Sequence, residues 1–202
     1  RLDDKTVPLP DDHFLTTFPQ RENLALAYAF CESEAVDKQS FFTMIKDYQG
    51  FEHRLRKIAE LERVSFWNDS KATNFAATLS ACESMKGTIF WIGGGRSKGG
   101  NLRSFVESMV QKIGKAFLFG EVGSRVKEIF DEKGFPYEMC SSVEEAVGKA
   151  YASVVRPTSI LFSPGFASFD THSSYADRGK DFMDIVFDLK NRLHQTTQEC
   201  FT

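Results

Sequence analysis

The most informative stretch for the fold is Thr88-Ile89-Phe90-Trp91-Ile92-Gly93-Gly94-Gly95, a short apolar run that ends in three glycines. Such a run is typical of a strand that is buried on both faces and is followed by a turn. Apolar strand patterns recur at 116–119, 137–139 and 159–162, and helical patterns occupy 74–85, 102–113, 123–133, 143–154 and 178–194. This alternation predicts a doubly wound α/β domain, in which helices cover both faces of a mostly parallel sheet.

The first third of the chain follows other patterns. Residues 1–19 carry three prolines and predict a loop, and residues 22–30 predict a buried helix. We expect a second helix over 37–47 that ends near Gly50, and two short strands within 54–67 that are joined near 60–62. Residues 1–55 hold too little apolar sequence for a core of their own. We therefore expect 1–55 to be the tail of a larger domain and 56–202 to form the α/β domain.

Composition narrows the classes of function. The chain has 202 residues, 42% of them hydrophobic and 26% charged, and a net charge of -3, as is typical of a globular protein in solution. No basic tract predicts nucleic-acid binding, and no apolar run approaches the roughly 20 residues of a membrane-spanning helix. The four cysteines are widely spaced without a C-x-x-C pair. We therefore expect reduced cysteines in a cytoplasmic protein and no metal site of the Cys/His type.

Polar residues crowd the turn after the second expected strand, in Trp67-Asn68-Asp69-Ser70-Lys71-Ala72-Thr73-Asn74. The carboxylate of Asp69 is suited to accept hydrogen bonds from a ribose diol, and the ammonium of Lys71 is suited to contact a phosphate or a substrate carboxylate. The alternative is that Thr73 or Asn74 caps the next helix while Asp69 and Lys71 are solvated. Residue pattern alone leaves both open.

Two further turns follow strands of the expected sheet. The segment 93–101 holds five glycines together with Arg96 and Lys98, so it is either an anion site or a plain turn, and it lacks the G-K-[ST] of a phosphate-binding P-loop. The segment 163–170 has the sequence Ser-Pro-Gly-Phe-Ala-Ser-Phe-Asp, which leaves backbone and hydroxyl groups open to a ligand or forms a capped loop. Ser168 does not fit the pattern of a serine-hydrolase nucleophile. Ligands of such folds gather at the carboxyl ends of the strands, where all three turns are expected.

In their order along the chain, these segments resemble the Mur ligase family of peptidoglycan amide ligases, and within it the members that add D-glutamate to UDP-N-acetylmuramoyl-L-alanine. The resemblance runs from about residue 15 to the end and rests on Glu22–Ala25, Phe51-Glu52-His53-Arg54, 68–74, 94–99, 163–170, Tyr175 and Arg178-Gly179. Gly165-Phe166 and Gln20-Arg21-Glu22 depart from the family's usual residues. The alternatives are another Mur or folylpolyglutamate-type ligase, and a non-catalytic module that binds a nucleotide or an acidic metabolite.

The resemblance implies a Rossmann-like C-terminal ligase domain, preceded by the end of a central ATP-binding domain. ATP would phosphorylate the carboxylate of UDP-N-acetylmuramoyl-L-alanine, and the amine of D-glutamate would attack the acyl phosphate. The phosphate-binding loop and the main Mg²⁺ ligands would lie in sequence that this chain lacks, so we expect the chain alone to be inactive. The full protein would act as a monomer in the bacterial cytoplasm.

The resemblance also implies a role for individual residues. It implies that the nucleotide is bound by Asn23, Arg54, Asn68, Asp69 and Lys71. It implies that D-glutamate is bound by Thr73, Lys98, Ser168, Phe169 and Tyr175. Lys71 and Lys98 would be the catalytic lysines.

Overall fold

The computed structural model describes residues 9, 14–16, 20–48 and 50–199, and of residues 14, 194 and 196–199 it describes the backbone only. The chain forms two compact units, unit 1 (Arg1–Phe51) and unit 2 (Glu52–Thr202). The loop expected at 1–19 falls largely outside the described residues. No helix in the described part of the chain combines the length and the apolar character that crossing a bilayer requires.

Unit 1 holds the short helix η1 (Phe14–Thr16) and the helices α1 (Gln20–Ser33) and α2 (Lys38–Ile45). A small apolar cluster joins them. The prediction of a buried helix was wrong for most of α1, because only Leu24 and Tyr28 are buried, whereas Leu26 and Phe30 are 71% and 67% exposed. Helix α2 ends at Ile45, five residues before Gly50.

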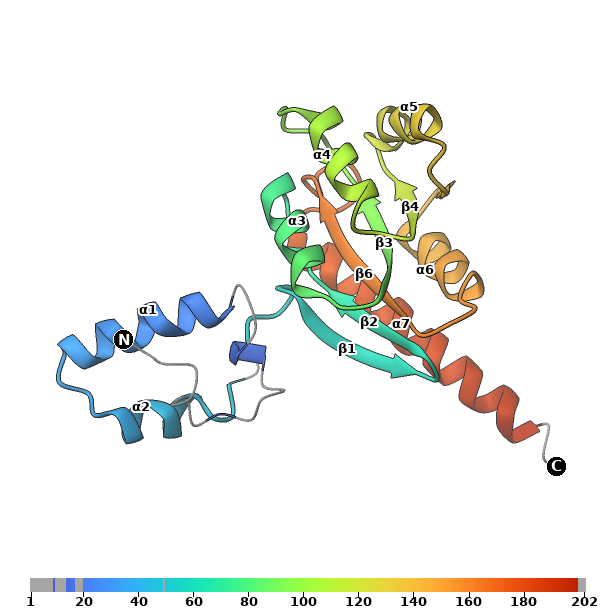
Figure 1. The fold of residues 1–202 in the computed structure, drawn as a ribbon. Coiled ribbons are helices and arrows are strands. Elements are labelled where there is room, and N and C mark those ends of the chain that lie inside the picture. The colour runs from blue at the N-terminus through green and yellow to red at the C-terminus, as the bar shows by residue number, and fades with distance from the viewer. Residues whose placement is uncertain (1–8, 10–13, 17–19, 49, 200–202) are drawn as a thin grey trace. The chain divides into compact units, whose positions relative to one another are not determined.

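The sheet of unit 2 has the strand order β1-β2-β6-β3-β4-β5 (Figure 1). Its strands are β1 (Arg56–Leu61), β2 (Val64–Asn68), β3 (Thr88–Gly94), β4 (Lys115–Phe119), β5 (Tyr137–Met139) and β6 (Thr158–Gly165). Only β1 runs antiparallel, paired with β2 through a two-residue turn at 62–63, slightly later in the chain than expected. The prediction of a mostly parallel sheet is confirmed.

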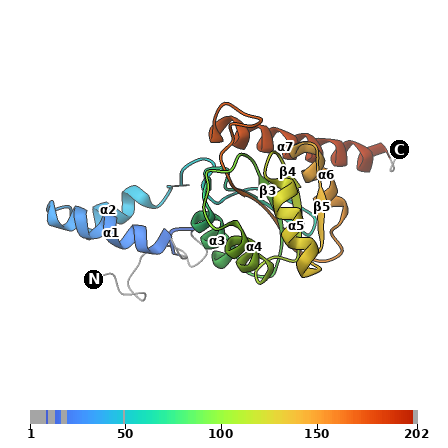
Figure 2. The ribbon, with the colours of Figure 1, turned by 90° about the horizontal axis from the view of Figure 1, so that it is seen from above.

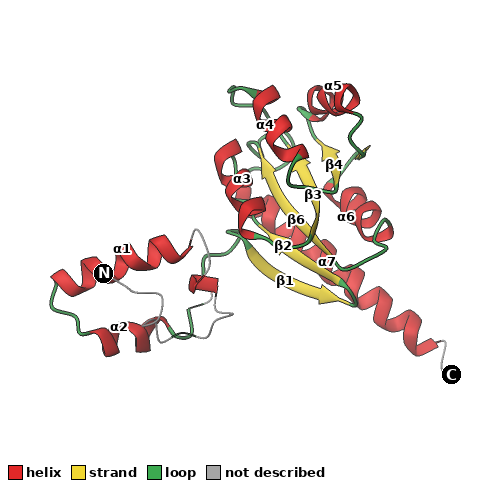
Figure 3. Cartoon of the chain, in the orientation of Figure 1, coloured by secondary structure: helices red, strands yellow, loops and turns green. Residues whose placement is uncertain are grey.

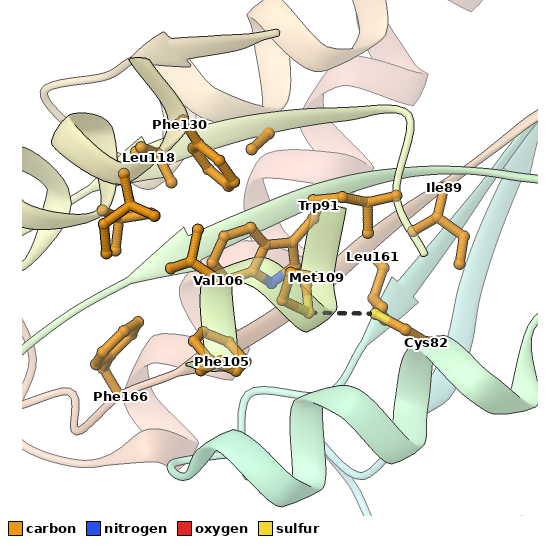
Figure 4. Packing of buried hydrophobic residues seen from close by; sticks show 14 of the residues in the cluster. Cys82, Ile89, Trp91, Phe105, Val106, Met109, Leu118, Phe130, Leu161 and Phe166 are labelled. Carbon is orange, nitrogen blue, oxygen red and sulfur yellow. Dashed lines mark hydrogen bonds between the residues drawn. The ribbon is translucent and has the colours of Figure 1, made fainter. Parts of the chain in front are cut away.

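Helices cover both faces of this sheet, as Figures 2 and 3 show. One face carries α3 (Phe75–Ser84), α4 (Leu102–Val110) and α5 (Gly123–Lys133), and the other carries α6 (Val143–Ala152) and α7 (Tyr175–Glu199). Figure 4 shows the core of the first face, where Trp91 of β3 lies among Phe105, Met109 and Leu118. Helix α7 begins three residues earlier than expected, because the Ser174 hydroxyl accepts a hydrogen bond from its first turn.

Candidate functional site

Four neighbouring strands of unit 2 end at one edge of the sheet, which we call the rim. Strands β2, β6, β3 and β4 are parallel neighbours, so their carboxyl ends lie side by side (Figure 1). The turns after β2, β3 and β6 carry most of the residues singled out above. The rim is therefore the place in unit 2 where these polar side chains can act together.

Asn68, at the end of β2, is fully buried and holds three segments together. Its amide nitrogen donates to the carbonyl of Gly179 at 2.8 Å and lies 3.1 Å from Nδ1 of His53. Its amide oxygen accepts a hydrogen bond from the backbone N–H of Ser70 at 3.1 Å. The geometry of this side chain is that of a positioning residue at the base of the rim.

Asp69 is only 5% exposed, so the alternative of a solvated carboxylate is wrong. One carboxylate oxygen accepts a hydrogen bond from the backbone N–H of Leu55 at 2.9 Å, and the other accepts one from the hydroxyl of Ser163 at 2.7 Å. Burial raises the pKa of Asp69 to about 6, against the pull of these hydrogen bonds and of the nearby charge of Arg54. Asp69 thereby ties the segment before β1 to the middle of the sheet.

Arg178 is the largest charged side chain in the interior, and it is fully buried. Its guanidinium donates to the hydroxyl and the carbonyl of Ser70, at 3.0 and 2.9 Å, and to the carbonyl of Phe166 at 3.1 Å. Burial lowers its pKa to about 10, and the charge of Asp170 opposes that shift, so Arg178 is cationic at neutral pH. The turns after β2 and β6 are therefore held to α7 by one cation.

Sequence reasoning took Arg178 for the start of a helix and missed this role. The adjoining Gly179 carries a signal, because a Cβ there would lie 2.3 Å from Nδ1 of His53. An arginine followed by an obligatory glycine marks a place where a helix start approaches another segment closely.

The glycines at the end of β3 allow close packing of the backbone. Gly94 and Gly95 have φ values of +149° and +130°, and a Cβ on them would lie 1.9 Å from the carbonyl oxygen of Phe119 and 2.3 Å from that of Ala167. Arg96 is exposed and forms an ion pair with Glu121 at 3.1 Å. These glycines are therefore required by the close approach of β4 and of the turn after β6.

Two of the expected D-glutamate residues meet at the rim. The ammonium of Lys98 donates to the hydroxyl of Thr73 at 3.2 Å, although the two residues come from different turns. Asn74, and not Thr73, caps α3, by accepting a hydrogen bond from Ala77 at 2.9 Å. The hydroxyl of Thr73 is thus left to face the ammonium group of Lys98.

Aromatic rings are exposed on the turn after β6 and at the start of α7. Phe169 is 63% exposed and Tyr175 is 37% exposed, whereas Ser168 is only 2% exposed. The ammonium of Lys71 lies 5.5 Å from the centroid of the Tyr175 ring, which is a cation–π distance. The rim therefore holds two pairs of neighbouring side chains, Lys71 with Tyr175 and Lys98 with Thr73.

Of the other expected nucleotide residues, Arg54 is exposed just before β1, and its charge acts on Asp69. Asn23 lies on α1 in unit 1, where its amide donates to Gln20 at 3.3 Å. Among the described residues, no group of three or more His, Cys, Asp or Glu could hold a metal ion.

No protein-family model matches the chain. Comparison with curated proteins finds UDP-N-acetylmuramoylalanine–D-glutamate ligases, among them that of Caldanaerobacter subterraneus, 32% identical over 192 residues, and that of Natranaerobius thermophilus, 33% identical over 185. These matches cover 94% and 91% of the chain. The chain belongs to the Mur ligase family. It spans 43% and 39% of the length of these two relatives, so it corresponds to part of a Mur ligase.

Solved structures agree on the fold. The UDP-N-acetylmuramate–alanine ligase of Thermotoga maritima superposes with a TM-score of 0.64 at 13% identity, over 85% of this chain and 38% of that one. At this identity the likeness concerns the fold alone, and it agrees with the expected α/β fold with a mostly parallel sheet.

Proposed function

We propose that this Mur ligase chain is the C-terminal part of an ATP-dependent amide ligase that adds D-glutamate to UDP-N-acetylmuramoyl-L-alanine. The observation that carries the proposal is the 32% identity to a D-glutamate ligase over 94% of the chain. In this proposal unit 2 is the C-terminal ligase domain, and unit 1 is the end of the central ATP-binding domain. The whole protein is proposed to be a monomer in the bacterial cytoplasm.

Lys98 and Thr73 are proposed to bind one carboxylate of D-glutamate. An ammonium and a hydroxyl that lie 3.2 Å apart offer several donors to one anionic group. Phe169 and Tyr175 are proposed to flank the carbon chain of the amino acid, because their rings are accessible at the same rim. Ser168 is proposed for the inner wall, since so little of its surface is exposed.

The nucleotide end of the site is proposed to use the cations Arg54 and Lys71. Each oxygen of the Asp69 carboxylate uses one lone pair internally, which leaves a second lone pair for a ribose hydroxyl. Asn68 is proposed to act indirectly, because both ends of its amide are engaged within the protein. Asn23 of α1 is proposed as a further nucleotide-binding residue, because it belongs to the segments that resemble the Mur ligases.

ATP is proposed to supply the phosphoryl group that activates the carboxylate of the sugar–peptide substrate. The residues of the rim fit the anionic part of such a substrate in charge, through Lys71, Lys98 and Arg54. The main Mg²⁺ ligands and the phosphate-binding loop are assigned to the rest of the longer protein. The rim would then contribute by orienting the attacking amine and by neutralising charge, without a nucleophile of its own.

An amino-acid panel on the full-length enzyme tests the substrate. We expect ADP release with UDP-N-acetylmuramoyl-L-alanine to depend on D-glutamate; preference for L-alanine or for a folate-linked glutamate would overturn the proposal. The 202-residue chain alone is expected to be inactive, and full turnover by it would contradict the proposed division of labour.

A matched pair of lysine variants tests the site. Lys98→Met should raise the KM for D-glutamate by about 10- to 100-fold, because one charge-assisted interaction is lost. Lys86→Met, at an exposed lysine that follows α3, should leave the KM unchanged. Equal values for both variants would remove Lys98 from the site.

A further inference from the structure

A second concave surface lies at the opposite edge of the unit 2 sheet from the rim. It is formed by the β1–β2 turn, the end of α6 and the segment before β6, and it encloses about 430 Å³. The amino ends of β2 and β6 meet there, since Val64 pairs with Thr158. A volume of several hundred Å³ suits a small organic molecule, whereas a single water occupies about 30 Å³.

Two arginines line this depression. The side chains of Arg63 and Arg156 form no ion pair and no hydrogen bond with any residue that the structure describes. Two other exposed arginines of unit 2 do have carboxylate partners, since Arg96 pairs with Glu121 at 3.1 Å and Arg103 pairs with Glu132 at 2.6 Å. The lining also holds one carboxylate, that of Glu62, so the two guanidinium groups leave a net positive charge that an anion can neutralise by bidentate contacts.

The backbone beneath these arginines is fixed. Thr158 is buried, and its N–H donates to the carbonyl of Arg63 at 3.0 Å while its hydroxyl donates to the carbonyl of Arg156 at 2.8 Å. The turn residue Glu62 has a φ of +52°, which residues other than glycine seldom adopt. A positive φ is usual in a two-residue hairpin turn, so the hairpin of β1 and β2 holds the backbone that carries Arg63.

The depression also has an apolar side. Val155 is 89% exposed within its lining, and the ring of Tyr151 stacks on buried Phe66 with centroids 6.3 Å apart. A ligand with an aromatic or aliphatic body would cover Val155 and lie against a ring whose position is fixed by the core.

We propose that this depression binds a small organic anion, a carboxylate or a phosphate that carries an apolar body. Arg63 and Arg156 pair with the anionic group, and Tyr151 and Val155 contact the apolar body. The site is separate from the rim and does not depend on the ligase proposal, because it lies at the amino ends of the strands.

Titrations followed by amide chemical shifts in the ¹⁵N-labelled chain test the site, with phenyl phosphate, benzoate and inorganic phosphate as probes. We expect saturating shifts at residues 62, 63, 155 and 156, with a Kd at or below about 1 mM for at least one aromatic probe. Inorganic phosphate should bind at least about fivefold more weakly, because it lacks the apolar body. The better of the two aromatic probes identifies the anionic group.

The double variant Arg63→Ala/Arg156→Ala should weaken binding at least about tenfold, whereas Arg125→Ala, at an exposed arginine of α5, should not. Val155→Glu places a carboxylate beside the two arginines and should abolish binding without disturbing the core. The proposal fails if no probe saturates the shifts by about 20 mM, or if the shifts survive both the double variant and Val155→Glu.

Discussion

Replacing Asp69 by asparagine should remove a pH dependence from the stability of unit 2. Burial raises the pKa of Asp69 to about 6 in the folded protein, whereas an unfolded aspartate titrates near 3.8. Between these values the folded state binds the proton more tightly than the unfolded state does. The contribution of Asp69 to the free energy of unfolding therefore rises as the pH falls through 6 toward 3.8, and the cost of its buried charge is fully present above that range.

The difference between the two pKa values corresponds to about 3 kcal/mol in the free energy of unfolding. About 2 kcal/mol of this stability should be gained as the pH falls from 7 to 4.5. His53 acts in the opposite direction, because burial lowers its pKa and its protonation favours the unfolded state as the pH falls below 6.5. The difference between wild type and Asp69→Asn cancels the contribution of His53. Asparagine preserves the shape, since its oxygen can accept from Leu55 while its amide donates to Ser163.

Urea unfolding at several pH values measures this difference through tryptophan fluorescence. Trp67 and Trp91 are the two tryptophans of the chain and both lie in unit 2, so the signal reports on this unit. The control is Asp184→Asn, at an exposed position of α7. The reasoning is refuted if the free-energy difference between wild type and Asp69→Asn changes by less than about 0.5 kcal/mol between pH 7 and pH 4.5.

Three further substitutions test the packing of unit 2 by denaturant unfolding. Gly179→Ala should cost about 2 kcal/mol, because its Cβ would lie 2.3 Å from Nδ1 of His53; an unchanged midpoint would contradict this close approach. Phe182→Ala should cost about 3–5 kcal/mol, since its buried ring stacks on Phe162 at 4.4 Å, and a loss below about 1 kcal/mol would mean that the cavity collapses. Asn74→Ala should cost about 1 kcal/mol by removing the cap of α3, and Asn74→Asp should restore most of it; equal losses would exclude the cap as the cause.

The strands and helices of unit 2 were predictable because each has a local hydrophobic period. The strand expected at 137–139 coincides with β5, and the helix expected at 123–133 coincides with α5. Strand β6 runs on to Gly165, although Ser163-Pro164-Gly165 has the composition of a turn. Gly165 pairs with Gly94, and its N–H donates to the carbonyl of Ala72 at 2.9 Å, so contacts with distant segments override the local preference.

The candidate site was predictable as a location and less so in its detail. Parallel strands necessarily end at one edge, so the turns with Lys98 and Thr73 were expected to converge. The hydrophobic pattern of residues 22–30 led to a wrong prediction of burial, because the apolar residues Leu26 and Phe30 of α1 are exposed. A hydrophobic period shows which face of a helix is apolar, but it does not show whether anything covers that face.

The local sequence by itself determined the alternation of strands and helices, because each element has its own hydrophobic period. It also determined the edge of the sheet at which polar side chains gather, because parallel strands all end at the same edge. Three-dimensional contact decided which of those side chains became interior. Asp69 meets Ser163 across 94 residues, and Arg178 meets Ser70 across 108. The burial of a charge depends on partners that donate or accept its hydrogen bonds, and these partners come together only when the sheet and α7 are assembled.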